Sequence, residues 1–291
     1  MKNFFYAIVI IVAFAGCKSD TIDLKFNLPK GSSYDYNMDM IMAVKGDVNG
    51  QPMNVTNNMS MGYRFGVIGD SAGWKKISST ISRIAMNIDA GSGVNIKFDS
   101  DKPVDTSDVM SGTVGKVLGA LKGGQFTFTM NEKGEIGSVT GISEMMNRMM
   151  SSVPNAGAMA GSMGNSFNED NFKQNIQQAF GVYPSKPVKP GDTWTSTMSM
   201  NNAGMQMKID NTYTLQSVTN NIADVKVDSK ISGNSGVGID GTMKGDLKYD
   251  VPTGVPVDGD LDMSMNMNVP QSGQSAPMTM DIKMKITGKK S

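Results

Sequence analysis

The chain has 291 residues, with 27 Lys and Arg against 27 Asp and Glu, no histidine and one cysteine. This balance provides no basic field for nucleic acid, and the lack of histidine excludes Ser-His-Asp and Cys-His catalysis as well as imidazole metal ligands. A single cysteine excludes an internal disulfide, so stability must come from burial, for which the chain is long enough.

The first residues are typical of a targeting segment rather than of a folded domain. Lys2 is followed by an apolar run from Phe4 to Phe14 and then by Ala15-Gly16-Cys17. The run is shorter than the ~20 residues that a membrane-spanning helix needs. Small residues directly before a cysteine are the pattern that lipoprotein signal peptidase cuts, so we expect a signal peptide at residues 1–16 and lipidation of Cys17. More than one acyl chain at this cysteine would give a stable anchor.

The residue after the cysteine bears on the membrane that holds the anchor. Lys18 stands where inner-membrane lipoproteins of well-studied Gram-negative cells carry an Asp. We therefore expect a lipid-anchored protein of the outer membrane, with the choice between the periplasmic and the surface-facing leaflet left open. Residues 17–23 form the lipidated tether between this anchor and the folded part.

Beyond the tether, apolar and polar residues alternate with a period of two, which is typical of half-buried strands. The apolar positions run from Tyr34 to Val44 and from Val55 to Val67, and the pattern returns over 205–215, 261–269 and 278–286. One apolar and one polar face favour an antiparallel sheet. The spacing of these runs predicts about a dozen strands.

Turn residues separate the predicted strands. They occur at Asn49-Gly50, at Gly69-Asp70, at Pro252-Thr253-Gly254 and between Pro270 and Pro277. Gly, Pro, Asn and Asp favour turns because they adopt or preset the backbone angles that turns require. We therefore expect the chain to reverse at these four places.

Helical spacing of apolar residues interrupts the strands in the middle of the chain. It predicts helices over 110–121, 142–150 and 172–180, although three glycines weaken the first of them. Glu169 and Asp170 favour the start of the third helix. Small residues over 154–166 indicate a loop between the second and third helices.

The two halves of the chain resemble each other. Leu28-Pro29-Lys30-Gly31 matches Val188-Lys189-Pro190-Gly191 at an offset of 160, and Lys76–Ser82 matches Lys226–Ser232 at an offset of 150. Two copies of a β-meander explain the match, and chance similarity between amphipathic strands is the alternative. The sequence thus predicts a mainly β fold with a few helices. We expect a curved antiparallel sheet, an open half-barrel, from two repeated β-meanders, with helices of the middle segment packed on one face.

The same patterns suggest a division of the chain. A first β-meander with a helix would occupy residues 24–140, a helical or flexible connector 141–182, and a second β-meander 183–291. Residues 24–291 are long enough to bury a sizeable core as one globular unit.

A longer motif carries a resemblance. The segment Tyr183-Pro184-Ser185-Lys186-Pro187-Val188-Lys189-Pro190-Gly191-Asp192-Thr193-Trp194, with the strand from Leu24 to Tyr34, resembles a family of uncharacterised Gram-negative lipoproteins, a domain of unknown function. The resemblance covers most of the mature chain and implies an envelope location, with no known catalytic or binding residues. The architecture it implies is similar to the half-barrels of lipoprotein and lipid carriers, an analogy that does not give function.

Methionine is unusually frequent, with 27 residues. One interpretation is a soft core, because thioethers fill irregular gaps. A second is an adaptable surface for a lipid, since Met packs strands less rigidly than Val or Ile. A third is Cu(I) binding through Met-x-Met pairs, whose sulfurs are soft ligands. The candidate hydrophobic-ligand face consists of Tyr34, Tyr36, Met38, Met40, Met42, Met59, Met61, Tyr63, Met198, Met200, Met205, Met207, Met263, Met265 and Met267.

The sequence offers no set of catalytic residues. Its few glutamates form no obvious acid–base pair, and the acidic clusters around Asp99 and Asp258 lack the spacing of a calcium-binding EF-hand loop. We expect no enzyme activity, no cofactor and no metal site. The favoured function is a membrane-anchored envelope lipoprotein that binds a lipid or other hydrophobic ligand, and the alternative is a structural or scaffold lipoprotein with a closed core. Protein partners and oligomeric state stay open.

Overall fold

The computed structural model describes residues 21–48, 50–91, 93–105, 109–152, 169, 172–173, 176–177, 183–202, 205–233, 238–271 and 274–291. The predicted signal peptide and Cys17 lie outside the described residues, so lipidation stays a prediction. The elements in chain order are β1 (Ser33–Val48), β2 (Gln51–Ser71), β3 (Trp74–Asp89), β4 (Asn95–Asp99), α1 (Val109–Gly119), β5 (Gln125–Asn131), β6 (Ile136–Thr140), α2 (Ile142–Ser151), β7 (Thr193–Asn202), β8 (Met205–Thr219), β9 (Ile222–Gly233), β10 (Gly238–Asp250), β11 (Val255–Gln271) and β12 (Gln274–Lys290).

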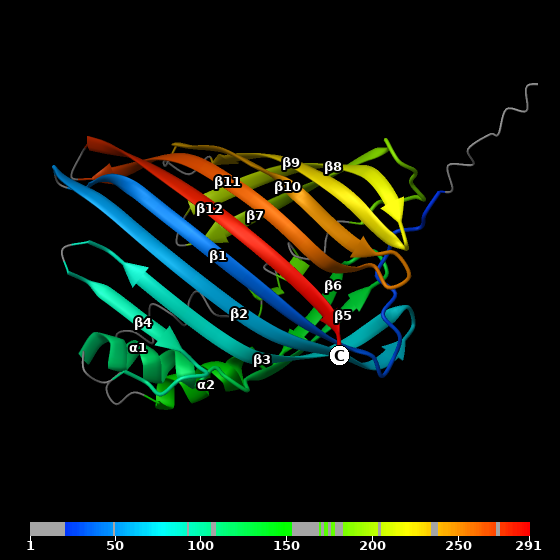
Figure 1. Ribbon diagram of the computed structural model, residues 1–291, viewed down its shortest axis with the longest axis horizontal. Coiled ribbons are helices and arrows are strands. Elements are labelled where there is room, and N and C mark those ends of the chain that lie inside the picture. The colour runs from blue at the N-terminus through cyan, green and yellow to red at the C-terminus, as the bar shows by residue number, and fades with distance from the viewer. Residues whose placement is uncertain are drawn as a thin grey trace, which may run out of the picture.

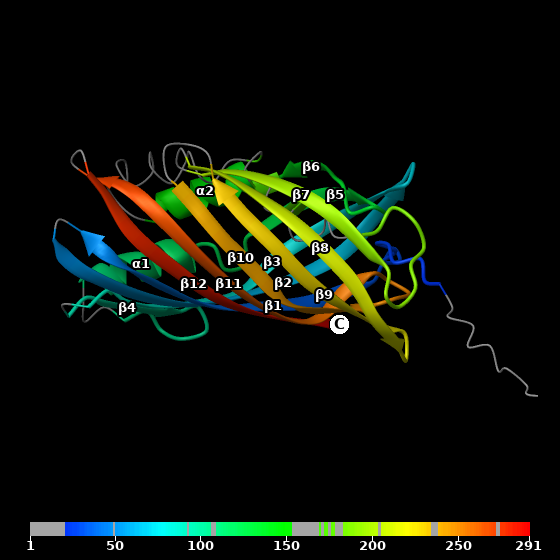
Figure 2. The same ribbon diagram turned by 90° about the horizontal axis from the view of Figure 1, so that it is seen from above.

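The described strands form one 12-stranded sheet in the order β6-β5-β3-β2-β1-β12-β11-β10-β9-β8-β7, with β4 paired to β3. Figures 1 and 2 show that the sheet is strongly curved, so that its edge strands β6 and β7 lie on the same side of the molecule. No pairing between β6 and β7 closes the sheet in the described part of the chain. The predicted curved, open antiparallel sheet is confirmed.

The sheet consists of two meanders that lie side by side, and the strands of both follow one another in the same direction across the sheet. One contains β1 to β6 and the other β7 to β12, and the pairing of β1 with β12 joins them. Each meander begins with the same turn. The Gly31 N–H donates to the Val67 carbonyl oxygen at 2.9 Å, and the Gly191 N–H donates to the Leu215 carbonyl oxygen at 2.8 Å. Both glycines have positive φ, 83° and 93°. The predicted repeat is therefore present in the backbone.

The second predicted offset of the repeat is wrong by two residues. Val67 corresponds to Leu215 in the hydrogen bonds of the two turns, whereas an offset of 150 would pair it with Ser217. Side chains alternate with a period of two, so a shift by two residues leaves every side chain on its predicted face. The sequence pattern therefore cannot distinguish the two alignments.

Two of the predicted turns are misplaced. β2 continues through Gly69 to Ser71, and the chain reverses at Ala72-Gly73, whose φ values are 52° and 80°. Positive φ at both central residues matches the twist of a two-residue hairpin. Gly69 lies instead at a register shift between β2 and β3. Pro270 and Pro277 belong to the paired strands β11 and β12, so that connection is shorter than predicted, whereas the turn at Pro252-Thr253-Gly254 is confirmed.

Helices α1 and α2 confirm the first two predicted helices, and the third lies largely outside the described residues. α2 buries Ile142, Met145, Met146 and Met149. These side chains belong to the same core cluster as Phe126 and Phe128 of β5. The helices therefore pack against the inner side of the curved sheet, as Figure 2 shows.

The segment before β1 covers one end of the sheet. Leu24, Phe26 and Leu28 are almost completely buried, and Ile22 exchanges backbone hydrogen bonds of 2.7 and 2.9 Å with Val188. We call the end of the sheet that this segment covers the aromatic end. It is defined by Tyr34, Tyr36, Tyr63, Phe65 and Phe128. The β1–β2 and β11–β12 connections lie at the opposite end, the hairpin end (Figure 1).

Candidate functional site: the concave methionine face

Four methionines lie side by side across neighbouring strands on the inner side of the sheet. Met40 of β1 is paired with Met284 of β12 on one side and with Met59 of β2 on the other. Met59 is paired in turn with Met86 of β3, which faces Phe98 of β4. Directly opposite residues share a face, with Cβ atoms ~4.5–5.5 Å apart. Their side chains therefore form a continuous band.

A second band runs beside the first, one pleat closer to the hairpin end. It contains Met243, Met263, Ile282 and Met42 on β10, β11, β12 and β1. Further along, Met265 faces Met280 and Met267 faces Met278. We call the whole surface the methionine face. Its members are Met38, Met40, Met42, Met59, Met61, Met86, Met243, Met263, Met265, Met267, Met278, Met280 and Met284.

The structure divides the predicted ligand-face residues into three groups. The predicted methionines of β1, β2 and β11 come together in the methionine face. Tyr34, Tyr36 and Tyr63 lie at the aromatic end instead. Met198 and Met207, on β7 and β8, pack against a cluster that contains Ile209 and Ile231 together with Met265 and Met267, so they adjoin the methionine face. Met200 and Met205 lie in β7 and β8, and their side chains are outside the described part.

Several members of the methionine face were missed by sequence reasoning. In β3 a register shift opposite Gly62 and Tyr63 changes the inward positions from odd to even, so that Ile81 and Met86 share a face. Met243 lies between Gly241 and Gly245, which interrupt the apolar alternation. The β12 alternation itself was recognised, but only the pairing of β12 with β1 places Met284 beside Met40.

The two ends of the concave side differ in packing. At the aromatic end, the Phe65 ring stacks on Tyr63 with centroids 5.9 Å apart and meets Phe128 edge-on at 6.1 Å. The space left among these side chains is only about 20 Å³. In the methionine face, by contrast, Met40 and Met59 stay partly exposed. The aromatic end is therefore a closed core. At the other end Met265 and Met267 are buried, and apolar surface is presented around Met40 and Met59.

The tyrosines at the closed end are uncharged. Burial raises the pKa of Tyr63 to about 12 and moves the pKa values of Tyr36, Tyr183 and Tyr249 well above the ordinary tyrosine value. The Tyr183 hydroxyl donates a hydrogen bond of 2.7 Å to the Gly254 carbonyl oxygen. These hydroxyls stay protonated at neutral pH.

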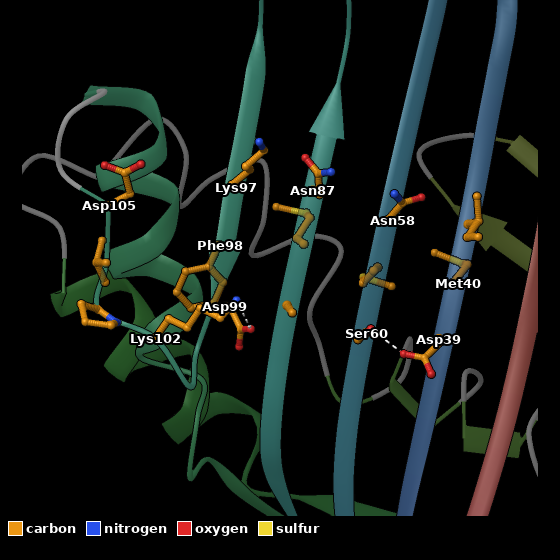
Figure 3. Close-up of a pocket in the computed structure, with 16 residues that line it drawn as sticks. Asp39, Met40, Asn58, Ser60, Asn87, Lys97, Phe98, Asp99, Lys102 and Asp105 are labelled. Carbon is orange, nitrogen blue, oxygen red and sulfur yellow. Dashed lines mark hydrogen bonds and ion pairs between the residues drawn. The ribbon is translucent and has the colours of Figure 1, made fainter.

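A hollow of about 630 Å³ lies where the first methionine band meets β4. Its lining includes Met40, Met59, Met86 and Phe98, with polar neighbours on the same strands. In Figure 3 the Phe98 ring extends from β4 toward the loop that carries Lys102 and Asp105. The hollow therefore combines an apolar strip with polar surroundings.

The acidic clusters have partners of opposite charge. Asp99 lies 3.1 Å from Arg83, and Asp101 lies 2.6 Å from Lys122. In the other cluster, Asp260 faces Lys285 at 3.2 Å. Among the described residues, no group of three or more His, Cys, Asp or Glu side chains could hold a metal ion. The carboxylates of both clusters are therefore ion-paired with neighbouring lysine and arginine side chains.

The fold and its concave surface define a class of protein: an open, curved antiparallel sheet with a partly exposed, methionine-rich inner face. Within that class, the chain belongs to the family of unknown function DUF6263, whose profile matches residues 72–256. Membership of a family without known function agrees with the resemblance described above. No match was found among curated protein sequences.

Solved structures show where this fold recurs. A structure of lipovitellin, from work on its lipid–protein interactions, is similar with a TM-score of 0.52 and 10% identity, over 90% of this chain and 25% of that chain. The chain thus spans about a quarter of the lipovitellin chain. An outer membrane channel (COG4313) from Pseudomonas putida F1 matches 92% of this chain and 98% of its own length, with 6% identity and a TM-score of 0.27, too low to inform function. No helix in the described ranges is long and apolar enough to cross a membrane.

Proposed function

We propose that this protein is a non-enzymatic lipoprotein of the cell envelope that holds a lipid or another hydrophobic ligand against the methionine face. The observation that carries the proposal is the band of Met284, Met40, Met59 and Met86 across four strands. Contiguous apolar surface that stays partly exposed is typical of binding sites. Covering it would gain ~25 cal/mol for each Å² removed from water.

The residue type supports a ligand without a fixed shape. A thioether side chain is unbranched and polarisable, so its rotamers adjust to an irregular partner. β-Branched residues have few χ1 choices and give a fixed surface. An acyl chain has many conformations, and a methionine surface can follow it where a surface of Val and Ile cannot.

The fold similarity supports the same conclusion by analogy. The lipovitellin structure concerns a protein whose interactions with lipid were studied, and its matching part has the same kind of curved sheet. A fold can host several functions. The weight of the proposal therefore rests on the methionine face itself.

The position of the predicted anchor gives the site an orientation. Ile22 is fixed to Val188 at the aromatic end, and the chain from Cys17 to Ile22 can span at most about 20 Å. An acylated Cys17 would hold the aromatic end close to the membrane. The hairpin end, with its methionine bands, would then point away from the anchor.

Two observations support alternatives. The packed aromatic end, where about 20 Å³ is left, favours a structural lipoprotein whose function lies in protein contacts. The adjacent thioethers of Met40, Met59 and Met284 favour Cu(I), which prefers soft sulfur ligands. Both alternatives leave the methionine face without lipid.

The test uses the predicted mature chain, residues 17–291 with Cys17→Ser, which lacks both the apolar signal segment and the acylation site and so avoids detergent. We expect organic extracts of the purified protein to contain host lipid, and the delipidated protein to bind Nile red with increased fluorescence. Met40→Lys should abolish the signal, whereas Ile68→Lys, at an exposed position of β2 outside the hollow, should not. A lipid-free protein that leaves Nile red dark would count against the proposal, and copper near stoichiometry in a metal analysis would favour the Cu(I) alternative.

A further inference from the structure

One polar residue interrupts the methionine face. Asn57 of β2 lies between Met42 of β1 and Ile88 of β3, in line with the second methionine band. Neither neighbouring side chain can donate a hydrogen bond, and Asn57 Oδ1 is buried without a partner. A buried polar atom without a partner is unfavourable, and most such atoms in folded proteins are paired. The site therefore favours an occupant that donates a hydrogen bond.

The second band continues from Met243 through Ser229 of β9 to Asn211 of β8, and this second asparagine shows the contrast. Asn211 of β8 accepts a hydrogen bond of 2.6 Å from the Ser229 hydroxyl and donates one of 3.2 Å to Ser196 Oγ. Its amide is satisfied within the protein, and its side chain is buried. Only at Asn57 does the band present an amide oxygen that the protein leaves unpaired.

The methionine face also lacks charge. No acidic or basic side chain occupies the inward positions of Met38–Gly46 on β1, Met53–Tyr63 on β2, Leu261–Val269 on β11 or Ala276–Gly288 on β12. The charges of these strands lie on the outer face, where Lys283 pairs with Asp262 at 3.3 Å. A carboxylate or phosphate placed against these inward positions would lose its hydration and find no cation on the four strands, whereas Lys97 and Lys102 lie around the hollow beside β4.

We propose that the ligand is an uncharged lipid whose hydroxyl or amide group donates a hydrogen bond to Asn57 Oδ1. This inference rests on the proposed lipid-binding function and restricts it to neutral lipids, of which acylglycerols are the simplest. The acyl chain lies along the methionine bands, and the polar group of the lipid lies at Asn57. A charged lipid can use the same surface only if its headgroup stays in water.

The experiment compares two lipids that share one acyl chain. Nile red is bound to the mature Cys17→Ser protein, residues 17–291, at pH ~8, where the carboxyl of oleate is ionised, and is displaced by 1-monooleoylglycerol or by oleate below their aggregation concentrations. We expect monooleoylglycerol to displace the dye at a concentration at least about tenfold lower than oleate, because only oleate must desolvate a charge.

Matched variants locate the effect. Asn57→Leu removes the hydrogen-bond acceptor. It should lower the affinity for monooleoylglycerol severalfold, while Nile red still binds. Asn54→Leu, on the exposed side of the same strand, should change neither affinity. Asn57→Lys adds the missing cation, so the preference should reverse toward oleate. Circular dichroism establishes that each variant is folded. The comparison of the two lipids on the parent protein does not depend on any variant.

The outcomes separate this inference from the proposed function. If oleate displaces the dye as well as or better than monooleoylglycerol, the restriction to neutral lipids is overturned and lipid binding stands. If the Asn57→Leu protein binds monooleoylglycerol as tightly as its parent does, the hydrogen bond to Asn57 is overturned. If neither lipid binds and Nile red stays dark, the proposed function fails together with the inference.

Discussion

Asn211 of β8 lies directly opposite Ser229 of β9, and the Ser229 hydroxyl donates a hydrogen bond of 2.6 Å to the amide oxygen of Asn211. The pair separates two apolar clusters on the inner side of the sheet. Tyr213 and Val227 belong to one cluster, and Ile209 and Ile231 belong to the other. Because both partners are neutral and buried, their hydrogen bond is part of the core.

Breaking this pair should reduce stability. Ser229→Ala leaves the Asn211 amide oxygen unpaired, and we expect the free energy of unfolding to fall by about 1–3 kcal/mol. The double variant Asn211→Leu with Ser229→Ala should cost less than the sum of the single changes, since the amide oxygen that Ser229→Ala leaves unpaired is then absent. Urea denaturation of the parent and three variants measures the coupling, and strictly additive losses would contradict it.

The core of the second meander should be sensitive to cavities. Leu215 is 0% exposed, so Leu215→Ala should lower the free energy of unfolding by about 2–5 kcal/mol. Ile68 is 52% exposed, and Ile68→Ala should change it by less than about 0.5 kcal/mol. Chemical denaturation measures the free energy of unfolding of both variants. Equal decreases would show that Leu215 is not in a packed core.

The repeated turn predicts equal effects at two distant positions. Gly31 and Gly191 have positive φ, and an added Cβ would meet nothing within 4 Å at either of them. Ala at each position should therefore cost only backbone strain, about 1–2 kcal/mol. Thermal unfolding of Gly31→Ala and Gly191→Ala should show similar decreases. A loss at only one of them would contradict the structural equivalence of the turns.

Buried tyrosines should make the fold sensitive to alkali. Burial raises the pKa of Tyr63 from 10.0 to about 12. Below pH ~10 the hydroxyl is protonated in the folded and the unfolded states, and between pH ~10 and ~12 the unfolded state loses its proton first. The free energy of unfolding should therefore fall as pH rises through this interval. Urea melts at several pH values test it, and Tyr63→Phe should make the decrease smaller.

The fold was largely predictable because its strands alternate so regularly. The inner face of β2 can be recognised from Val55, Met59 and Met61 without any knowledge of the neighbouring strands. The period of two also fixes the face where the alignment of the repeat was wrong by two residues. Turn positions were less predictable. Ala72 has positive φ, which an alanine does not signal in a sequence, whereas Gly69 looked like a turn and lies in β2.

The site was predictable only in part. Strand alternation shows which residues share a face, but not which strands are neighbours, so Met284 and Met40 could not be placed together. The register shift beside Gly62 concealed Met86 in the same way. Asn57 interrupts a run of apolar positions, and this irregularity is the signal that could have marked it as a functional residue.

The pairing of β1 with β12 has a consequence for how the protein is made. β12 follows the other described strands along the chain, yet it fills the central position beside β1. Until β12 is synthesised, β1 has one unpaired edge, and the sheet consists of two separate pieces. Contacts between residues so distant in sequence slow folding. The complete sheet is therefore expected to assemble only after β12 has been made.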